Sequence, residues 1–260
     1  MGRSSLKSVM RLIDVANNQV SIEQEFLNDL ETSIERTNMV NARKPSQTYK
    51  PSSMNCKRAM VYQVLGVDID TAASTYQSIG IAESGTDRHV RIQKAIESME
   101  DCDFVDVAEF VRQRGLQDIE IKGQTGMECK LYHKRLNMSF MCDGIIRYKN
   151  KYFIFEFKTE VADKFYNRKD VDESHHNQAT AYSLAFGLDD VLFVYENRNT
   201  LDKKAFIHHI SPKDREQLEM TIGYCQSYVE QNKIPPKPDD VLKKACSYCP
   251  YKSKCQEDNF

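Results

Sequence analysis

The segment 138–159, MSFMCDGIIRYKNKYFIFEFKT, contains the pattern that decides the fold. Its apolar and polar side chains alternate, and with MECKLYH at 127–133 it predicts an antiparallel meander of strands joined by short turns. One face of the last strand carries three aromatic residues, Phe153, Phe155 and Phe157. The other face carries Ile154, Glu156 and Lys158. An acid and a base two residues apart therefore point the same way.

A two-residue turn at 149–150 would fix the register of the last hairpin. In that register Asp143 lies opposite Glu156, with Cβ atoms roughly 4.5–5.5 Å apart. Two carboxylates this close repel each other, and a divalent cation between them relieves the repulsion. A shift of two residues would pair Asp143 with Lys158, whereas a slip of one residue would turn Asp143 away. The alternative is that Asp143-Gly144 is a turn or bulge, and that Glu156 and Lys158 form an exposed, salt-bridged strand face.

Helices are predicted on both sides of these strands. Apolar residues recur at helical spacing near 22–36, 53–65, 76–99, 104–114, 173–186 and 212–231. Two further strands are predicted at VLFVYEN, 191–197, and AFIHHI, 205–210. This order predicts an α/β fold with a mixed sheet flanked by helices and a mostly helical N-terminal part.

Local signals refine these helices. Ser21 and Gln24 have the spacing of a capping box, and Ser52 or Ser53 is a plausible N-cap of the second helix. Gly80 and Gly85 are expected to interrupt the third helix. In the helix at 173–186, a spacing of four places two polar side chains on one face, Gln178 and Tyr182.

The chain has eight cysteines and no visible secretory signal, so we expect a reducing, cytoplasmic setting in which thiols bind metals or are buried. CSYCPYKSKC separates Cys246, Cys249 and Cys255 by two and then five residues, a spacing that indicates a shared inorganic centre. Its fourth ligand must lie upstream. Spacing alone leaves zinc and an iron-sulfur cluster open. The remaining thiols are expected to be buried small hydrophobes: Cys102, Cys129, Cys142 and Cys225.

Three segments resemble motifs of a known family: GTDRHVRIQ at 85–93, CDGIIRYKNKYFIFEFKT at 142–159 and QATAY at 178–182. They resemble the PD-(D/E)XK nucleases of the RecB-type branch. The resemblance implies a restriction-endonuclease-like fold and phosphodiester hydrolysis that depends on Mg²⁺ or Mn²⁺. The implied activity is an exonuclease that prefers single-stranded DNA ends. Ligation by an imidazole would favour Mn²⁺ over Mg²⁺.

The resemblance also implies roles for individual residues. The metal ligands would be His89, Asp143, Glu156 and the backbone carbonyl of Phe157. Lys158 would orient or activate the attacking water, and Gln178 and Tyr182 would position DNA or support the site. Glu128 resembles a recurrent acid of the family, without an assigned role.

Cys56 is the implied fourth cysteine ligand, since SSMNCKRAM at 52–60 resembles the helix start that carries this cysteine in iron-sulfur nucleases. The set Cys56, Cys246, Cys249 and Cys255 resembles the 4Fe-4S arrangement of AddB-like nucleases and of CRISPR-associated exonucleases of the Cas-four type. The implied organisation is an N-terminal helical extension at 1–50, a nuclease core at 51–232 and a cysteine tail at 233–260.

Charge and hydropathy limit the partners. A net charge of −2 offers no overall attraction for a polyanion, so DNA would need a local basic groove. Candidate basic residues, each equally explained as solvated surface, include Arg88, Arg91, Lys164 and Arg168. No apolar run reaches the length of a membrane span. Protein partners in recombination, replication or CRISPR adaptation, and an oligomer, are compatible with the sequence. Two alternatives to a nuclease stay open: a non-catalytic nucleic-acid-binding partner, and an interaction protein held together by a structural zinc site.

Overall fold

A computed structural model describes residues 21–40, 46–70, 75–125, 128–237, 246 and 249–258. The chain divides into two compact units. The first comprises 1–43 and 71–83, and the second comprises 44–70 and 84–260. The tail expected at 233–260 belongs to the second unit, whereas the core expected at 51–232 is divided, because 71–83 belong to the first unit.

The described part of the first unit contains α2, Ile22–Val40, and the first turns of α4, Tyr76–Glu97. The backbone N–H of Gln24 donates to Ser21 Oγ at 3.3 Å, so Ser21 caps α2 as expected. The Gln24 side chain donates to Asn28 at 3.1 Å. The α4 helix runs without a break through Gly80 and Gly85, so the expected interruption is wrong.

The second unit is built on a five-stranded mixed sheet with strand order β1-β5-β6-β7-β8. Its strands are β1 Cys102–Val105, β5 Gly144–Tyr148, β6 Lys151–Glu160, β7 Asp190–Asn197 and β8 Lys203–His209. The β6 and β7 strands are parallel, and the other pairs are antiparallel. A separate antiparallel sheet has the order β2-β3-β4. Its strands are β2 Ile119–Thr125, β3 Glu128–His133 and β4 Met138–Cys142. The α/β class predicted from the sequence is confirmed.

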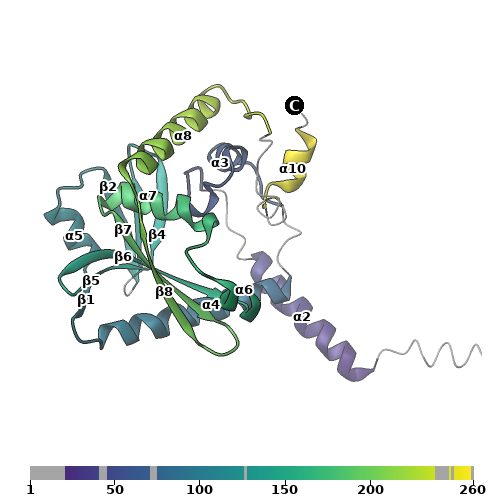
Figure 1. Cartoon of the computed structure of the whole chain (residues 1–260). Helices are drawn as coiled ribbons and strands as arrows, with labels where there is room; N and C mark the ends of the chain where they lie inside the picture. The colour runs from purple at the N-terminus through teal and green to yellow at the C-terminus, as the bar shows by residue number, and fades with distance from the viewer. Residues whose placement is uncertain are drawn as a thin grey trace, which may run out of the picture. The chain divides into compact units, whose positions relative to one another are not determined.

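Helices flank the five-stranded sheet (Figure 1). Besides α4, the described helices of the second unit are α3 Lys57–Val64, α5 Val107–Gln113, α6 Ala162–Asn167, α7 His176–Phe186, α8 Pro212–Glu230 and α10 Lys252–Glu257, with short 3-10 turns at Pro51–Ser53 and Glu173–His175. On one sheet face the β6 phenylalanines pack with Ile92 and Ile96 of α4. On the other face Ile154 belongs to the larger core, which includes residues of α3, α7 and α8. Strand β6 is therefore buried on both faces at 153–157, where its residues are mostly apolar.

The hairpin register predicted from the sequence is confirmed. Lys149 and Asn150 have φ angles of 48° and 64°, the left-handed pair that a type I′ turn requires. Tyr148 pairs with Lys151, and Gly144 pairs with Phe155. The pairing ends at Gly144, so Asp143 precedes β5 and lies outside the ladder.

Three other expectations are wrong. The stretch 138–148 is two strands in different sheets, because the chain turns at Asp143 between β4 and β5. The segment expected to be helical from 104 starts as strand β1, and α5 begins after Asp106, whose side chain accepts from Glu109 N at 2.7 Å. The α3 helix has Cys56 at its N-cap position in place of a serine.

Within the described residues, no helix combines the length and the apolar character needed to cross a membrane.

Candidate metal centre and catalytic residues

Asp143 lies at the joint between the two sheets. The next residue, Gly144, has a φ of +151°, and a Cβ there would come within 2.7 Å of Phe104 Cε1. Only glycine fits this close approach without strain. The Asp143 carboxylate accepts a hydrogen bond from Phe157 N at 2.7 Å, and its backbone carbonyl accepts one from Gln93 Nε2 at 3.2 Å. The turn that separates the strands therefore holds this carboxylate in place.

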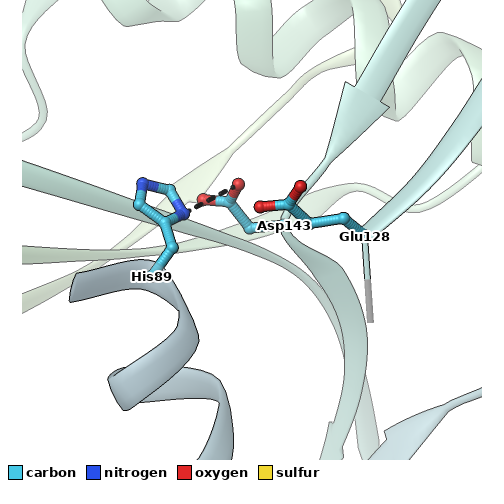
Figure 2. A group of neighbouring side chains, drawn as sticks. All are labelled: His89, Glu128 and Asp143. Atoms are coloured by element: carbon cyan, nitrogen blue, oxygen red, sulfur yellow. Dashed lines mark ion pairs between the residues drawn. The ribbon is translucent and has the colours of Figure 1, made fainter. Parts of the chain in front are cut away.

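Three potential metal ligands meet at this joint. One ligand atom each of His89, Glu128 and Asp143 lies within 4.8 Å of the others (Figure 2). Cys129 and Cys142 form the last pair of the β3-β4 ladder, and Glu128 and Asp143 are the residues that flank this pair in sequence. His89 comes from α4 and packs edge-on against the Phe157 ring, with centroids 5.1 Å apart. Side chains from one helix and two strand ends thus converge on one point.

The His89 ring packs against Phe157 and faces Asp143, but its Nδ1 makes no hydrogen bond. Its Nδ1 lies 3.2 Å from Asp143 Oδ1, yet this buried nitrogen has no partner with hydrogen-bond geometry. Burial alone would lower the pKa of His89, but the neighbouring Asp143 carboxylate raises it overall. A nitrogen and carboxylate oxygens facing one another without a hydrogen bond are a suitable donor set for a divalent cation.

Glu156 and Lys158 point toward α7 and form a second group beside the first. Lys158 Nζ donates to Glu156 Oε1 at 2.5 Å and to Gln178 Oε1 at 3.3 Å. Gln178 Nε2 lies 3.0 Å from the same Glu156 oxygen and 2.8 Å from Tyr182 Oη. Tyr182 in turn donates to the Met141 carbonyl at 2.9 Å. The polar face expected on this helix is therefore engaged with the strand carrying the acid and the base.

The group within 4.8 Å contains Glu128, whereas Glu156 lies outside it. Glu156 is 2% exposed, and its second oxygen, Oε2, is buried with no hydrogen-bond partner. The sequence left Glu128 without a role because its position near Asp143 depends on the β3-β4 pairing. Gln93 was missed altogether, although its spacing of four from His89 in HVRIQ places both on one face of a helix.

Burial and charge set the proton affinities here. Burial, and then the charge of Asp143, raise the pKa of Glu156 to about 7 against the opposing effect of Lys158. Burial lowers the pKa of Lys158, but Glu156 and Asp143 raise it overall. Lys158 is therefore a protonated cation at neutral pH, and Glu156 titrates near neutrality in the metal-free protein.

Several candidate basic residues are paired with buried carboxylates. Glu196 is fully buried, with Arg91 at 2.7 Å, Arg88 at 3.1 Å and Lys203 at 3.2 Å. Glu160 is buried and binds Arg168 and Lys164. These cations neutralise internal acids, so part of their positive charge is balanced by buried carboxylates.

Burial separates the cysteines into two groups. Cys102, Cys129, Cys142 and Cys225 are buried. Cys56, Cys249 and Cys255 pack around one small cluster formed by Ala59, Tyr62 and Tyr251. Burial raises the pKa of the Cys249 thiol, and the nearby thiols of Cys56, Cys255 and Cys246 raise it further. Three of the four expected ligands therefore share one cluster, and the exposed Cys246 lies near enough to affect Cys249.

Polar contacts hold the C-terminal segment against α3. Asp258 accepts from Arg58 through its backbone carbonyl and from Tyr62 through its carboxylate, both at 2.8 Å. Asp70 N donates to the Pro250 carbonyl at 2.7 Å. The cysteine at the start of α3 and the cysteines of the tail are thereby kept side by side.

Comparisons with known proteins assign no family to the chain. No family model matches the chain, and no curated protein matches it. One solved structure, described as "Crystal structure of SSO0001", is 14% identical, with a TM-score of 0.47 over 92% of this chain and 100% of that one. A likeness at this level carries no information about activity.

Proposed function

We propose that the chain is a divalent-metal-dependent nuclease of the RecB-type PD-(D/E)XK class that hydrolyses DNA, acting as an exonuclease on single-stranded ends. The observation that carries the proposal is the position of Asp143. Its carboxylate lies with His89 and Glu128 on one side and is bonded on the other to the strand that presents Glu156 and Lys158. A metal-ligand group with a neighbouring acid and lysine provides the types of side chain that metal-assisted phosphodiester hydrolysis requires.

The residues fit a divalent cation. Two buried atoms, His89 Nδ1 and Glu156 Oε2, lack hydrogen-bond partners, and a cation bound between His89 Nδ1 and Asp143 Oδ1 would satisfy the first. The Phe157 N–H points toward Asp143, and in a strand the carbonyl of the same residue points to the same side. His89, Glu128, Asp143, Glu156 and the Phe157 carbonyl would hold Mn²⁺ or Mg²⁺. A bound cation supplies Lewis-acid stabilisation of phosphate charge and lowers the pKa of a water ligand.

The protein groups have separate tasks in this proposal. The protonated Lys158 cannot accept a proton, so it orients the attacking water and offsets negative charge on the phosphate. Gln178 fixes the Lys158 ammonium and the Glu156 carboxylate relative to each other. Tyr182 anchors Gln178 to the backbone of β4. The network thus holds the lysine at a set distance from Asp143 before substrate binds.

The cysteines are proposed to hold a 4Fe-4S cluster through Cys56, Cys246, Cys249 and Cys255. Their shared packing and the mutual effect on the Cys249 thiol support a common centre. Cluster binding would stabilise the contact between α3 and the C-terminal segment. Zinc is the competing metal, and its thiolate sites are colourless, so visible absorbance of the purified protein separates the two.

The decisive experiment is digestion of end-labelled single-stranded DNA with Mn²⁺, with Mg²⁺ and with EDTA. We expect cleavage with Mn²⁺ that stops in EDTA, and loss of cleavage in Lys158→Ala. Lys151→Ala is the matched control, because Lys151 lies on the same strand and pairs with Asp190 instead. Circular single strands should resist an exonuclease. Binding of DNA without cleavage under every metal would favour the non-catalytic alternative.

A further inference from the structure

Two asparagine side chains join the segment before Cys56 to the first turn of α7. Asn177 Nδ2 donates to Asn55 Oδ1 at 3.0 Å and to the Met54 carbonyl at 3.1 Å. Asn55 Nδ2 donates to the Ser174 carbonyl at 2.9 Å. The side chains of Asn55 and Asn177 make these three hydrogen bonds, which we call the asparagine clamp. The clamp connects parts of the chain that are more than 100 residues apart, so it is a tertiary contact.

Each end of the clamp is one residue from a proposed functional group. Asn55 directly precedes Cys56, which occupies the N-cap position of α3. Asn177 directly precedes Gln178, whose amide contacts both Glu156 and Lys158. A displacement at either asparagine is therefore transmitted through a single peptide unit, which is planar and stiff.

Contacts besides the clamp also reach the start of α7: Asp172 caps the preceding 3-10 turn, and the rings of His175 and His176 lie 2.9 Å from Tyr195 Oη and His208 Nε2. The N-cap residue of α7, His175, makes no capping hydrogen bond with its side chain. An uncapped first turn leaves backbone N–H groups without partners inside the helix and opens more readily than the helix centre. The asparagine clamp thus holds the turn that carries Gln178.

We infer that the asparagine clamp couples the cysteine centre to the active site, with Asn55 and Asn177 acting as positioning residues for Gln178. This inference rests on the proposed nuclease function. A group bound by Cys56 would fix the Asn55 segment. The clamp fixes the first turn of α7, and Gln178 then holds Lys158 and Glu156. Loss of the clamp leaves the cysteine centre and the ligands at Asp143 in place but releases Gln178.

The first test uses Asn177→Ala and Asn55→Ala, with Asn167→Ala as the control. Asn167 is exposed, and its amide binds Asp163 within the same short helix. Loss of an outer hydrogen bond to a catalytic group lowers activity about tenfold or more. We expect kcat to fall by that factor in both clamp variants, with KM and the visible absorbance per chain unchanged. A wild-type kcat in a folded Asn177→Ala would overturn the inference, as would loss of the absorbance.

The second test does not depend on cleavage and separates this inference from the proposed function. Amide hydrogen exchange of residues 174–180 is measured in the full chain, in Cys56→Ser, in Asn177→Ala and in the double variant. Each single variant should exchange faster, and the double variant no faster than Asn177→Ala, because one path carries both effects. An unchanged rate in Cys56→Ser, or additive increases, would show that the centres are uncoupled. Asn55→Ala replaces Asn177→Ala should the latter fail to fold.

Discussion

The carboxylate of Asp143 accepts a hydrogen bond from the backbone N–H of Phe157 at 2.7 Å, which ties the joint between the two sheets to the strand carrying Glu156 and Lys158. One carboxylate oxygen makes this bond, and the other lies 3.2 Å from His89 Nδ1. The same side chain therefore makes a structural contact with one oxygen and faces a potential metal ligand with the other.

Asp143→Asn separates these two roles. The amide oxygen of asparagine can still accept from Phe157, so the free energy of unfolding should stay near the wild-type value. The charge is lost, and metal-assisted stabilisation worth several kcal/mol should disappear, which lowers kcat by about 100-fold or more. Calorimetric titration should show weaker Mn²⁺ binding. Asp103→Asn, at an exposed ion pair with Arg147, is the control. Wild-type Mn²⁺ affinity in Asp143→Asn would remove this residue from the metal centre.

Glu156 makes the stability of the metal-free protein depend on pH. Its pKa is raised from 4.5 to about 7, so the folded state binds more protons than the unfolded state within this window. The free energy of unfolding should therefore fall as the pH rises from about 4.5 to 7, by on the order of 3 kcal/mol, since one pKa unit is worth about 1.4 kcal/mol.

Urea unfolding in EDTA across this range measures the effect. Glu156→Gln should lack the fall, whereas Glu230→Gln, at an exposed position on α8, should retain it. Mn²⁺ should oppose the fall in the wild type, because a bound cation favours the charged carboxylate. Parallel pH profiles for the wild type and Glu156→Gln would contradict the raised pKa.

Gly144→Ala should destabilise the second unit. The added Cβ would meet the Phe104 ring at 2.7 Å, and alanine rarely adopts a φ of +151°. Backbone strain and overpacking together should cost about 2 kcal/mol or more. Gly85→Ala is the matched control, since nothing lies within 4 Å of its Cβ position in α4, and alanine favours a helix by roughly 0.5–1 kcal/mol. Thermal unfolding should shift in opposite directions, and equal shifts would count against the tight joint at Gly144.

Cys249→Ser should remove the visible absorbance and most of the bound iron, with reduced solubility of the purified protein, because a thiolate ligand is lost. Cys102→Ser should keep both, since Cys102 is buried in the sheet core beside Ile146 and Phe153. Iron analysis and the absorbance spectrum measure the difference. A colourless wild-type protein containing zinc would replace the iron-sulfur proposal with a structural zinc site.

Local chemistry accounts for the parts of the fold that the sequence predicted correctly. The turn at Lys149 and Asn150 sets the hairpin register, because a two-residue loop with two left-handed residues permits one pairing. The spacing of Gln178 and Tyr182 predicted a shared helix face, and the two side chains contact each other. Burial of the four isolated cysteines followed from their lack of motif context.

Long-range packing decided the rest. Alternating side chains look the same in one continuous strand and in two strands of different sheets, so only the packing of Phe104 against Gly144 reveals the turn at Asp143. Glu128 reaches Asp143 through the β3-β4 pairing, and His89 reaches it from a helix more than 50 residues earlier in the chain. Sequence alone determined which residue types could form the centre, because periodicity and turn chemistry are local. Tertiary structure decided which of them meet, because proximity between distant segments depends on how sheets and helices pack.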